Sequence, residues 1–234
     1  MSQANQAEVS RPDPAQQRQA LLELLRREPR GGAHLQEPRL RALIGGLEQA
    51  MPADLAAPGA LDLLEGVWEL RWSSSRQPYL AVGPWLENLQ LLTPSKGRGM
   101  NLMRLPGPLA PLAAIAVEAA IRVETETSGG AGALDSAAGQ CPRQRVQVRF
   151  QQGGFLGPAV GQGRLQLLRR VSQSFPAWLD ITVLDAELRI CRGNAGTMFA
   201  LLRRSDLKLE QLLLAPDQGP DDAGEDKSRQ VNLG

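Results

Sequence analysis

A chain of 234 residues suits one domain with appendages and can bury a core without disulfides or metals. Its 26 Lys and Arg residues nearly balance its 25 Asp and Glu residues, and the net charge of +1 lacks the basic excess expected of a nucleic-acid-binding protein. Cys141 and Cys191 lack metal-ligand spacing, so we expect two reduced thiols, with one disulfide between them as the alternative.

The N-terminus gives no targeting signal. Residues 1–17 are polar and carry Glu8 and Asp13, unlike a signal peptide or an organellar transit peptide. The least polar run, residues 105–117, is broken by three prolines and is shorter than the ~20 apolar residues of a membrane span. We therefore expect a soluble or peripheral protein.

Two helices are expected at the start, after a disordered segment at residues 1–13. Leucines cluster between Leu21 and Leu25, in a helix that begins at Pro14 and ends near Pro29. In the second helix one apolar stripe recurs at helical spacing, and its members are Leu40, Leu43, Ile44, Leu47 and Met51. The pattern predicts an αα-hairpin over residues 14–52 that packs on the main domain.

After an Ala/Pro linker at residues 52–60 the apolar period changes from 3.6 to 2, which favours strands. In the first strand, Trp68, Leu70 and Trp72 are expected to share one face. The strand candidates are 66–73, 88–93, 98–104, 115–126, 144–151, 164–171, 178–184, 187–192 and 197–204. About eight or nine short strands over residues 61–205 predict a mainly β fold, an antiparallel barrel or sandwich.

Three stretches are expected to lie outside regular structure. Residues 127–142 are low in complexity and indicate a flexible hairpin insertion. Residues 153–163 are rich in glycine and are interpreted as turns. Residues 216–234, rich in Asp, Gly and Lys, are expected to form a disordered tail.

No catalytic signature emerges from the residues. His34 is the single histidine and falls in a Gly-rich connection, as a solvated loop residue would. The acids Asp180, Asp185 and Glu187 fall within one hairpin, where capping of a turn is the simpler interpretation than acid–base catalysis. Arg189 and Arg192 are expected either to pair with these acids or to bind an anionic head group.

The aromatic residues are the candidates for a ligand site. Trp68, Trp72, Trp85 and Trp178, with Phe150 of the strictly alternating strand, either fill the core or line a cavity of the kind that closed eight-stranded barrels hold. The apolar residues of segment 105–121 are expected to line that cavity or to present an apolar lip to lipid.

Two segments resemble the plastid lipid-associated protein (fibrillin) family. Residues 64–75 resemble its first-strand motif, a Gly-x-Trp-x-Leu run that ends in small hydroxyl residues. Residues 179–204 resemble its closing motif, which includes Leu184-Asp185, Leu188-Arg189-Ile190 and Arg192-Gly193-Asn194. The chain departs from the family at Val183, where an aromatic is usual, and at Cys191, where Ser is usual.

The resemblance implies a lipocalin-like β-barrel and a non-enzymatic protein that binds carotenoids, prenylquinones or similar isoprenoid lipids at photosynthetic membranes, with a role in photoprotection. Without a transit peptide, a prokaryotic member in the cytoplasm or on the thylakoid surface is expected. No cofactor is expected apart from a hydrophobic ligand. The alternative is a scaffold with a filled barrel that docks a prenyl-lipid biosynthetic enzyme or coats the membrane. An enzyme acting on lipid or pigment is the least favoured hypothesis.

The candidate ligand-binding residues are Trp68, Trp72, Trp85, Phe150, Trp178, Asp185, Arg189 and Arg192. The polar members, together with Asp180, are expected to shape the barrel mouth or a partner surface.

Overall fold

The computed structural model describes residues 13–75, 77, 80, 82–124, 144–160 and 163–214. The predicted insertion at 127–142, the predicted tail at 216–234 and Cys141 lie outside these residues, as does the predicted disordered segment 1–13 apart from Asp13.

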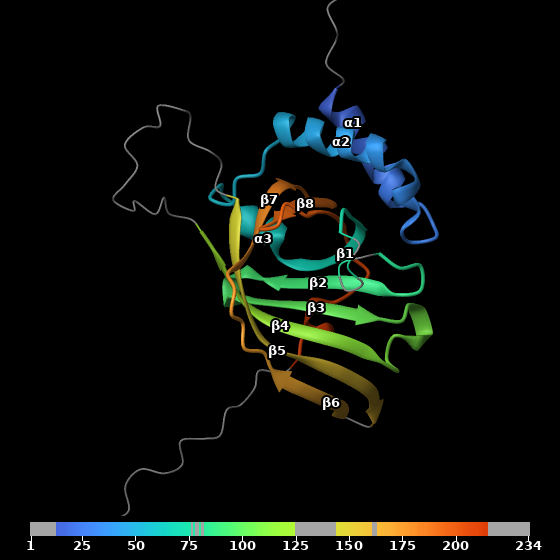
Figure 1. Cartoon of the computed structure of the whole chain (residues 1–234), viewed down its shortest axis with the longest axis vertical. Helices are drawn as coiled ribbons and strands as arrows, with labels where there is room; N and C mark the ends of the chain where they lie inside the picture. The colour runs from blue at the N-terminus through green and yellow to red at the C-terminus, as the bar shows by residue number, and fades with distance from the viewer. Residues whose placement is uncertain are drawn as a thin grey trace, which may run out of the picture.

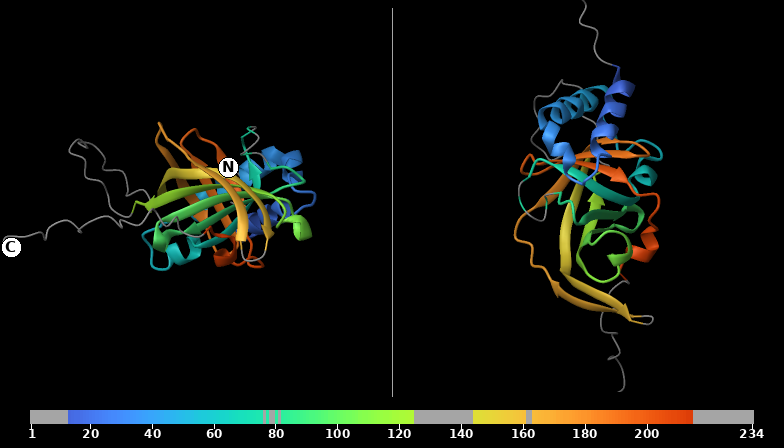
Figure 2. Two further views of the ribbon diagram at one scale, coloured as in Figure 1. Left: turned by 90° about the horizontal axis from the view of Figure 1, so that it is seen from below. Right: turned by 90° about the vertical axis from the view of Figure 1, so that its right-hand side faces the viewer.

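Two α-helices form the N-terminal pair (Figures 1 and 2). α1 spans Pro14–Leu25, and its start is capped by the Asp13 carboxylate, which accepts a hydrogen bond from the Ala15 N–H at 3.1 Å. α2 spans Glu37–Ala50 and follows the short 3-10 helix η1, Gly32–Gln36. The predicted leucine cluster and stripe are largely buried, because they pack on each other and on the outside of the β-sheet.

Nine strands follow in chain order. Their bounds are β1 Gly66–Ser73, β2 Glu87–Thr93, β3 Arg98–Arg104, β4 Ala114–Val123, β5 Arg145–Val160, β6 Gly163–Arg170, β7 Ala177–Leu184, β8 Leu188–Gly193 and β9 Met198–Arg203. Short helical pieces connect or flank them, and these are α3 Ala60–Leu64, η2 Pro94–Lys96, η3 Gly107–Leu109 and α4 Leu209–Leu212.

The sheet is closed and antiparallel. The strand order is β4-β3-β2-β1-β9-β8-β7-β5-β6, and an additional pairing of β4 with β5 joins the two ends into a barrel of eight strands. β6 is a further strand that pairs with β5 beyond the barrel (Figure 1). The predicted mainly β barrel with an N-terminal helical pair is thereby confirmed.

A β-bulge in β1 overturns the prediction that Trp68 and Trp72 share a face. Leu70 pairs with Leu201 and Trp72 with Ala200, so Arg71 is the extra residue on this strand. The bulge shifts the alternation by one residue. Trp68 therefore belongs to the barrel interior, whereas Trp72 belongs to the cluster beneath the helical pair.

β5 is longer than predicted, since residues 153–160 continue the strand instead of turning. A Cβ atom on Gly154 would lie 2.0 Å from the Leu167 carbonyl oxygen of β6, and one on Gly153 would lie 3.3 Å from the Ala116 carbonyl oxygen of β4. Glycine is needed here for close approach of neighbouring backbones within the sheet. Gly153 and Gly154 therefore allow the neighbouring strands to approach β5 closely, and their interpretation as turn residues was wrong.

Buried side chains form three clusters around the barrel wall. The interior cluster includes Trp68, Leu70, Ile181, Phe199 and Leu201. A second cluster joins the helical pair to the outer face of β7, β8 and β9, and a third covers the outer face of β1 to β5 with help from residues after β9. Much of the barrel wall is therefore buried on both faces.

The segment between α2 and β1 closes one end of the barrel. Ala53, Leu55 and Leu64 pack into the interior cluster. The Ala53 N–H donates to the Thr182 carbonyl at 2.9 Å, and the Trp68 indole N–H donates to the Leu64 carbonyl at 2.9 Å. This segment, which includes α3, acts as the floor of the barrel.

Candidate ligand cavity in the barrel

A cavity of about 340 Å³ lies inside the barrel, away from the floor. Its lining comes from strands β2, β3, β4, β5, β7, β8 and β9, from the segments after β1 and before β7, and from the turn between β8 and β9. Most of the walls are apolar, and among them are Leu92, Val117, Ala119, Ile121, Val148, Phe150, Leu179 and Phe199. Polar side chains are fewer, and they are Ser75, Gln77, Gln90, Asn101, Asn194 and Thr197. The volume lies at the lower end of the ~300–1,000 Å³ typical of small-molecule pockets.

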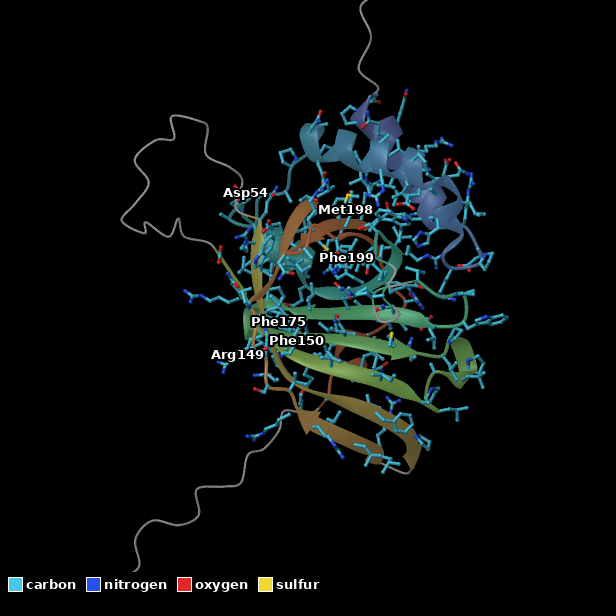
Figure 3. The ribbon with its side chains drawn as sticks, in the orientation of Figure 1. Asp54, Arg149, Phe150, Phe175, Met198 and Phe199 are labelled. Atoms are coloured by element: carbon cyan, nitrogen blue, oxygen red, sulfur yellow. The ribbon has the colours of Figure 1, made fainter. Side chains whose placement is uncertain are left out.

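Two phenylalanines mark the part of the cavity nearest to β7. Phe150 extends from β5, and Phe175 belongs to the segment that precedes β7 and is 57% exposed (Figure 3). The Gln173 side chain fixes this segment to β5, because it accepts from the Phe150 N–H at 2.7 Å and donates to the Val148 and Phe175 carbonyls at 3.2 and 2.6 Å. An exposed ring is therefore held at the opening.

Trp68 and two arginines lie between the cavity and the floor. The Arg203 guanidinium lies over the Trp68 ring at 4.3 Å from the centroid, and the Arg189 guanidinium is 5.1 Å from the same centroid. Arg189 is fully buried and donates from Nη2 to the Gln90 carboxamide oxygen. Burial lowers the pKa of Arg189 to about 10, so the side chain remains a cation at neutral pH.

An exposed apolar row continues the inner face of the barrel beyond its wall. Asn101 and Val117 are paired and line the cavity, and two residues further along the same face Met103 pairs with Ile115. Ile115 pairs with Phe155 of β5, which pairs with Leu167 of β6, and these three side chains are 41–62% exposed. We call Ile115, Phe155 and Leu167 the apolar ledge.

Further exposed leucines lie near the ledge in sequence. Leu109 and Leu112 precede β4, and Leu165 lies on the Leu167 face of β6. The structure thus divides the predicted 105–121 segment, since Val117 and Ile121 line the cavity while Leu109, Leu112 and Ile115 are exposed.

The candidate aromatic residues separate into three environments. Phe150 and Trp178 line the cavity, and the Trp178 ring is covered by the Arg145 guanidinium at 3.8 Å. Trp68 lies beneath the cavity without lining it. Trp72 lies outside the barrel under the helical pair, and Trp85 is 80% exposed in the connection between β1 and β2.

The charged candidates were predicted to shape the barrel mouth or a partner surface, but they do not gather at the mouth. Asp185 binds Arg18 of α1 through two hydrogen bonds of 2.7 and 2.9 Å, and Arg192 binds Glu48 of α2 at 2.8 and 2.6 Å. Both pairs attach the helices to the outside of the barrel. Asp180 pairs with Arg145 of β5.

Asp185 also caps its turn, as the sequence suggested. Its carboxylate accepts from the Glu187 and Leu188 N–H groups at 2.8 and 2.9 Å. Burial alone would raise the pKa of Asp185, but the Arg18 guanidinium and these two N–H groups outweigh burial and lower that pKa below its ordinary value. A carboxyl held in this way stays ionised, which suits a structural anchor.

Two buried glutamates on the outer face were not identified from the sequence. Glu69 and Glu87 are 4% and 2% exposed, and Arg30 and Arg204 bind both of them, while Arg104 also binds Glu87. Although burial opposes ionisation, the Arg204 and Arg104 hydrogen bonds lower the pKa of Glu87. These ion pairs join neighbouring strands on the outer wall, and Glu87, whose lowered pKa keeps it ionised, is a poor proton donor.

Gln90 and Phe175 are further cavity residues that sequence reasoning missed. Gln90 lies in a strand whose alternation places it on the same face as Leu92, and that alternation was the available signal. Phe175 lies in an irregular segment, and its position depends on contacts with Gln173 that no local pattern reveals.

The described part of the chain is thus a closed eight-stranded antiparallel barrel with a mainly apolar cavity, a class of fold whose interior is either filled by side chains or holds one small ligand. The PAP_fibrillin family model matches residues 140–202. This match supports the resemblance to the fibrillin family that the closing motif predicted. No curated protein and no solved structure matches the chain. Among the described residues, no helix is long and apolar enough to cross a membrane.

Proposed function

We propose that this protein is a non-enzymatic carrier that holds part of a hydrophobic ligand in its barrel cavity at a lipid surface. The observation that carries the proposal is the mainly apolar cavity of about 340 Å³ above a packed floor. The fibrillin family is generally lipid-associated and non-enzymatic, which agrees with this role. By the same family resemblance, the ligand is an isoprenoid lipid, such as a carotenoid or prenylquinone, at photosynthetic membranes, where it serves photoprotection and lipid homeostasis.

The cavity volume limits how the ligand is held. At ~30 Å³ per water-sized group, about 340 Å³ accommodates roughly 11 such groups. A carotenoid or a long-chain prenylquinone is several times larger. The cavity therefore takes one end of such a molecule, and the remainder lies across the opening and the apolar ledge.

Extraction of the purified full-length protein with organic solvent, followed by mass spectrometry, tests the proposal. A bound isoprenoid lipid in stoichiometric amount is the expected result. Binding of added quinone or carotenoid should then weaken by at least about tenfold in Ala119→Trp, since the indole occupies the cavity. The matched control is Leu35→Trp, at a residue that is 90% exposed on η1. Absence of any bound lipid, with no binding of added quinone or carotenoid, would refute the carrier.

The filled part of the barrel favours a second function, an interaction scaffold. Trp68, Leu70, Ile181 and Leu201 occupy the interior near the floor, and the ledge offers an exposed apolar surface. Such a scaffold would coat a membrane or dock a prenyl-lipid biosynthetic enzyme.

Flotation with lipid vesicles separates the two functions. Leu167→Glu should release the protein from vesicles in both cases, because the ledge meets the lipid. A scaffold floats with the vesicles but yields no bound lipid on extraction, and Ala119→Trp leaves its flotation unchanged. A carrier also binds added quinone or carotenoid, and Ala119→Trp weakens that binding.

A further inference from the structure

Arg189 is a buried cation without a counter-charge inside the barrel. Its side chain is fully buried, and no ion pair among the described residues includes it. Within the part of the chain that the structure describes, Nε and Nη1 have no nitrogen or oxygen acceptor, and Nη2 donates to Gln90. The buried Cys191 thiol, two residues along β8, interacts with the guanidinium, but burial raises the pKa of this thiol, so it supplies no negative charge at neutral pH. The Trp68 ring at 5.1 Å provides partial compensation.

This arrangement is costly for the folded barrel. A buried charge is tolerated when a partner of opposite sign and hydrogen bonds satisfy it. A neutral side chain of similar size would fill the same space without that cost. The unsatisfied guanidinium therefore points to a missing acceptor.

Gln90 connects this cation to the cavity. The inner face carries Trp68, Gln90 and Asn101 in one register across β1, β2 and β3. Gln90 and Asn101 line the cavity, whereas Trp68 lies beneath it. Since the Gln90 carboxamide oxygen accepts from Arg189, its NH₂ group is the end left for another acceptor.

We propose that the cavity selects amphiphiles with a carboxylate head, and that the head enters first and binds at Gln90 and Arg189. This inference rests on the proposed carrier function and names the chemical class of its ligand as an acid-headed chain, in place of the neutral carotenoid or prenylquinone that the family resemblance alone suggests. The carboxylate supplies the acceptors that Nε and Nη1 lack, and the Gln90 side chain turns aside or donates to the same oxygen. The apolar chain then contacts the cavity walls and leaves over the apolar ledge.

A neutral ligand end would be a poorer occupant. A hydrocarbon ring or an ester would leave the guanidinium without a charged partner in a site of low dielectric constant. Charge-assisted hydrogen bonds are about twice as strong as neutral ones. Discrimination between an acid and its ester is therefore the distinguishing property of this site.

The test uses the full chain after removal of lipid on a hydrophobic resin. Three probes of the same chain length, a long-chain fatty acid, its methyl ester and the corresponding alcohol, are titrated below their micelle concentrations. Affinity is measured by calorimetry and by the fluorescence of the tryptophans. The acid should bind at least about tenfold more tightly than the ester or the alcohol.

Variants assign the preference to the site. Arg189→Met should reduce the preference for the acid to less than about twofold while binding of the ester is kept, and Arg189→Lys should retain part of the preference. Gln90→Leu should reduce it by an intermediate amount. The control is Arg192→Met, which removes a cation of the same strand that binds Glu48 outside the barrel. Circular dichroism shows that each variant is folded.

The outcomes separate this inference from the carrier function. If wild-type protein binds acid and ester equally, the inference fails and the carrier function stands. A preference for the acid that persists in folded Arg189→Met also overturns the inference. If none of the three probes binds and no isoprenoid binds, both proposals fail. Should Arg189→Met not fold, the wild-type comparison and Gln90→Leu still decide.

Discussion

The Arg203 guanidinium covers the ring of Trp68 and also binds three carbonyl oxygens near the floor of the barrel. It donates to the Ala186 carbonyl at 2.8 Å, to the Glu65 carbonyl at 2.7 Å and to the Leu63 carbonyl. Gly66 makes room for it, since a Cβ atom at that position would lie 2.5 Å from Nη1. One side chain thereby joins the end of α3, the start of β1 and the turn between β7 and β8.

We expect Arg203→Met to lower the free energy of unfolding by about 2–4 kcal/mol, because charge-assisted hydrogen bonds and a cation–π contact are lost together. The free energy of unfolding of Arg203→Lys should lie between those of the wild type and Arg203→Met, because an ammonium group cannot bind the three carbonyls and stack on the ring at once. Urea denaturation measures both. A loss below ~0.5 kcal/mol for Arg203→Met, the range of ordinary surface changes, would contradict this role.

The Arg18–Asp185 pair should make stability depend on pH in the acid range. The folded-state pKa of Asp185 lies below its ordinary value of 3.8, so the ionised carboxyl stabilises the fold above that pH. Asp185→Asn should cost about 1–2 kcal/mol at pH 7. The difference from wild type should vanish as the pH falls through the folded-state pKa.

Thermal unfolding between pH 7 and pH 2 measures this difference. The matched comparison is Arg18→Met alone and combined with Asp185→Asn, which gives the coupling between the two side chains. No difference between wild type and Asp185→Asn at pH 7 would show that Asp185 acts through its turn alone, since Asn keeps an acceptor for the Glu187 and Leu188 N–H groups.

Trp72 should attach the helical pair through its volume and not through its indole N–H. Its ring lies in the cluster with α1 and α2, and its Nε1 has no hydrogen-bond partner among the described residues. Trp72→Ala should lower the free energy of unfolding by about 3–5 kcal/mol, whereas Trp72→Phe should cost much less.

Limited proteolysis of the helical pair, beside chemical denaturation, checks both Trp72 variants. Rapid cleavage within residues 13–50 is expected for Trp72→Ala. Equal losses for Phe and Ala would instead indicate that the indole makes a specific polar contact.

Gly154→Ala should disrupt the pairing of β6 with β5, because the new methyl group would lie 2.0 Å from the Leu167 carbonyl oxygen. Amide hydrogen exchange should report loss of protection in β6 and at the ledge, with the barrel strands little changed. Gly45→Ala is the control: its Cβ would meet no atom within 4 Å, and in the middle of α2 it should raise stability by about 0.5–1 kcal/mol. Unchanged exchange in β6 would contradict the close approach.

The fold was largely predictable from the sequence because alternating strands leave a strong signal. Eight of the nine strand predictions lie within three residues of the observed bounds, and the exception is β5 at its C-terminal end. The bulge at Arg71 was not predictable, since an extra residue in a strand leaves the local composition unchanged. It moved Trp72 from the interior to the helical interface.

The site was harder to predict because the wall is buried on both faces. In β8 the alternation of Leu188 and Ile190 with Arg189 indicates one apolar and one polar face, and a period-2 pattern then assigns the arginine to solvent or to a mouth. The helical pair covers the leucine face, so Arg189 and Cys191 point inward and are 0% exposed. Packing of the N-terminal helices, which are distant in sequence, therefore determines which face of β8 points into the barrel.

The floor formed by residues 53–65 has a consequence for exchange. A barrel that is closed by packed side chains at one end has a single opening, so a bound ligand dissociates through the opening by which it entered. Ligand exchange then requires that the bound ligand dissociates before the next one binds. The dissociation rate of the ligand, and not its association rate, would set how fast such a protein transfers ligand.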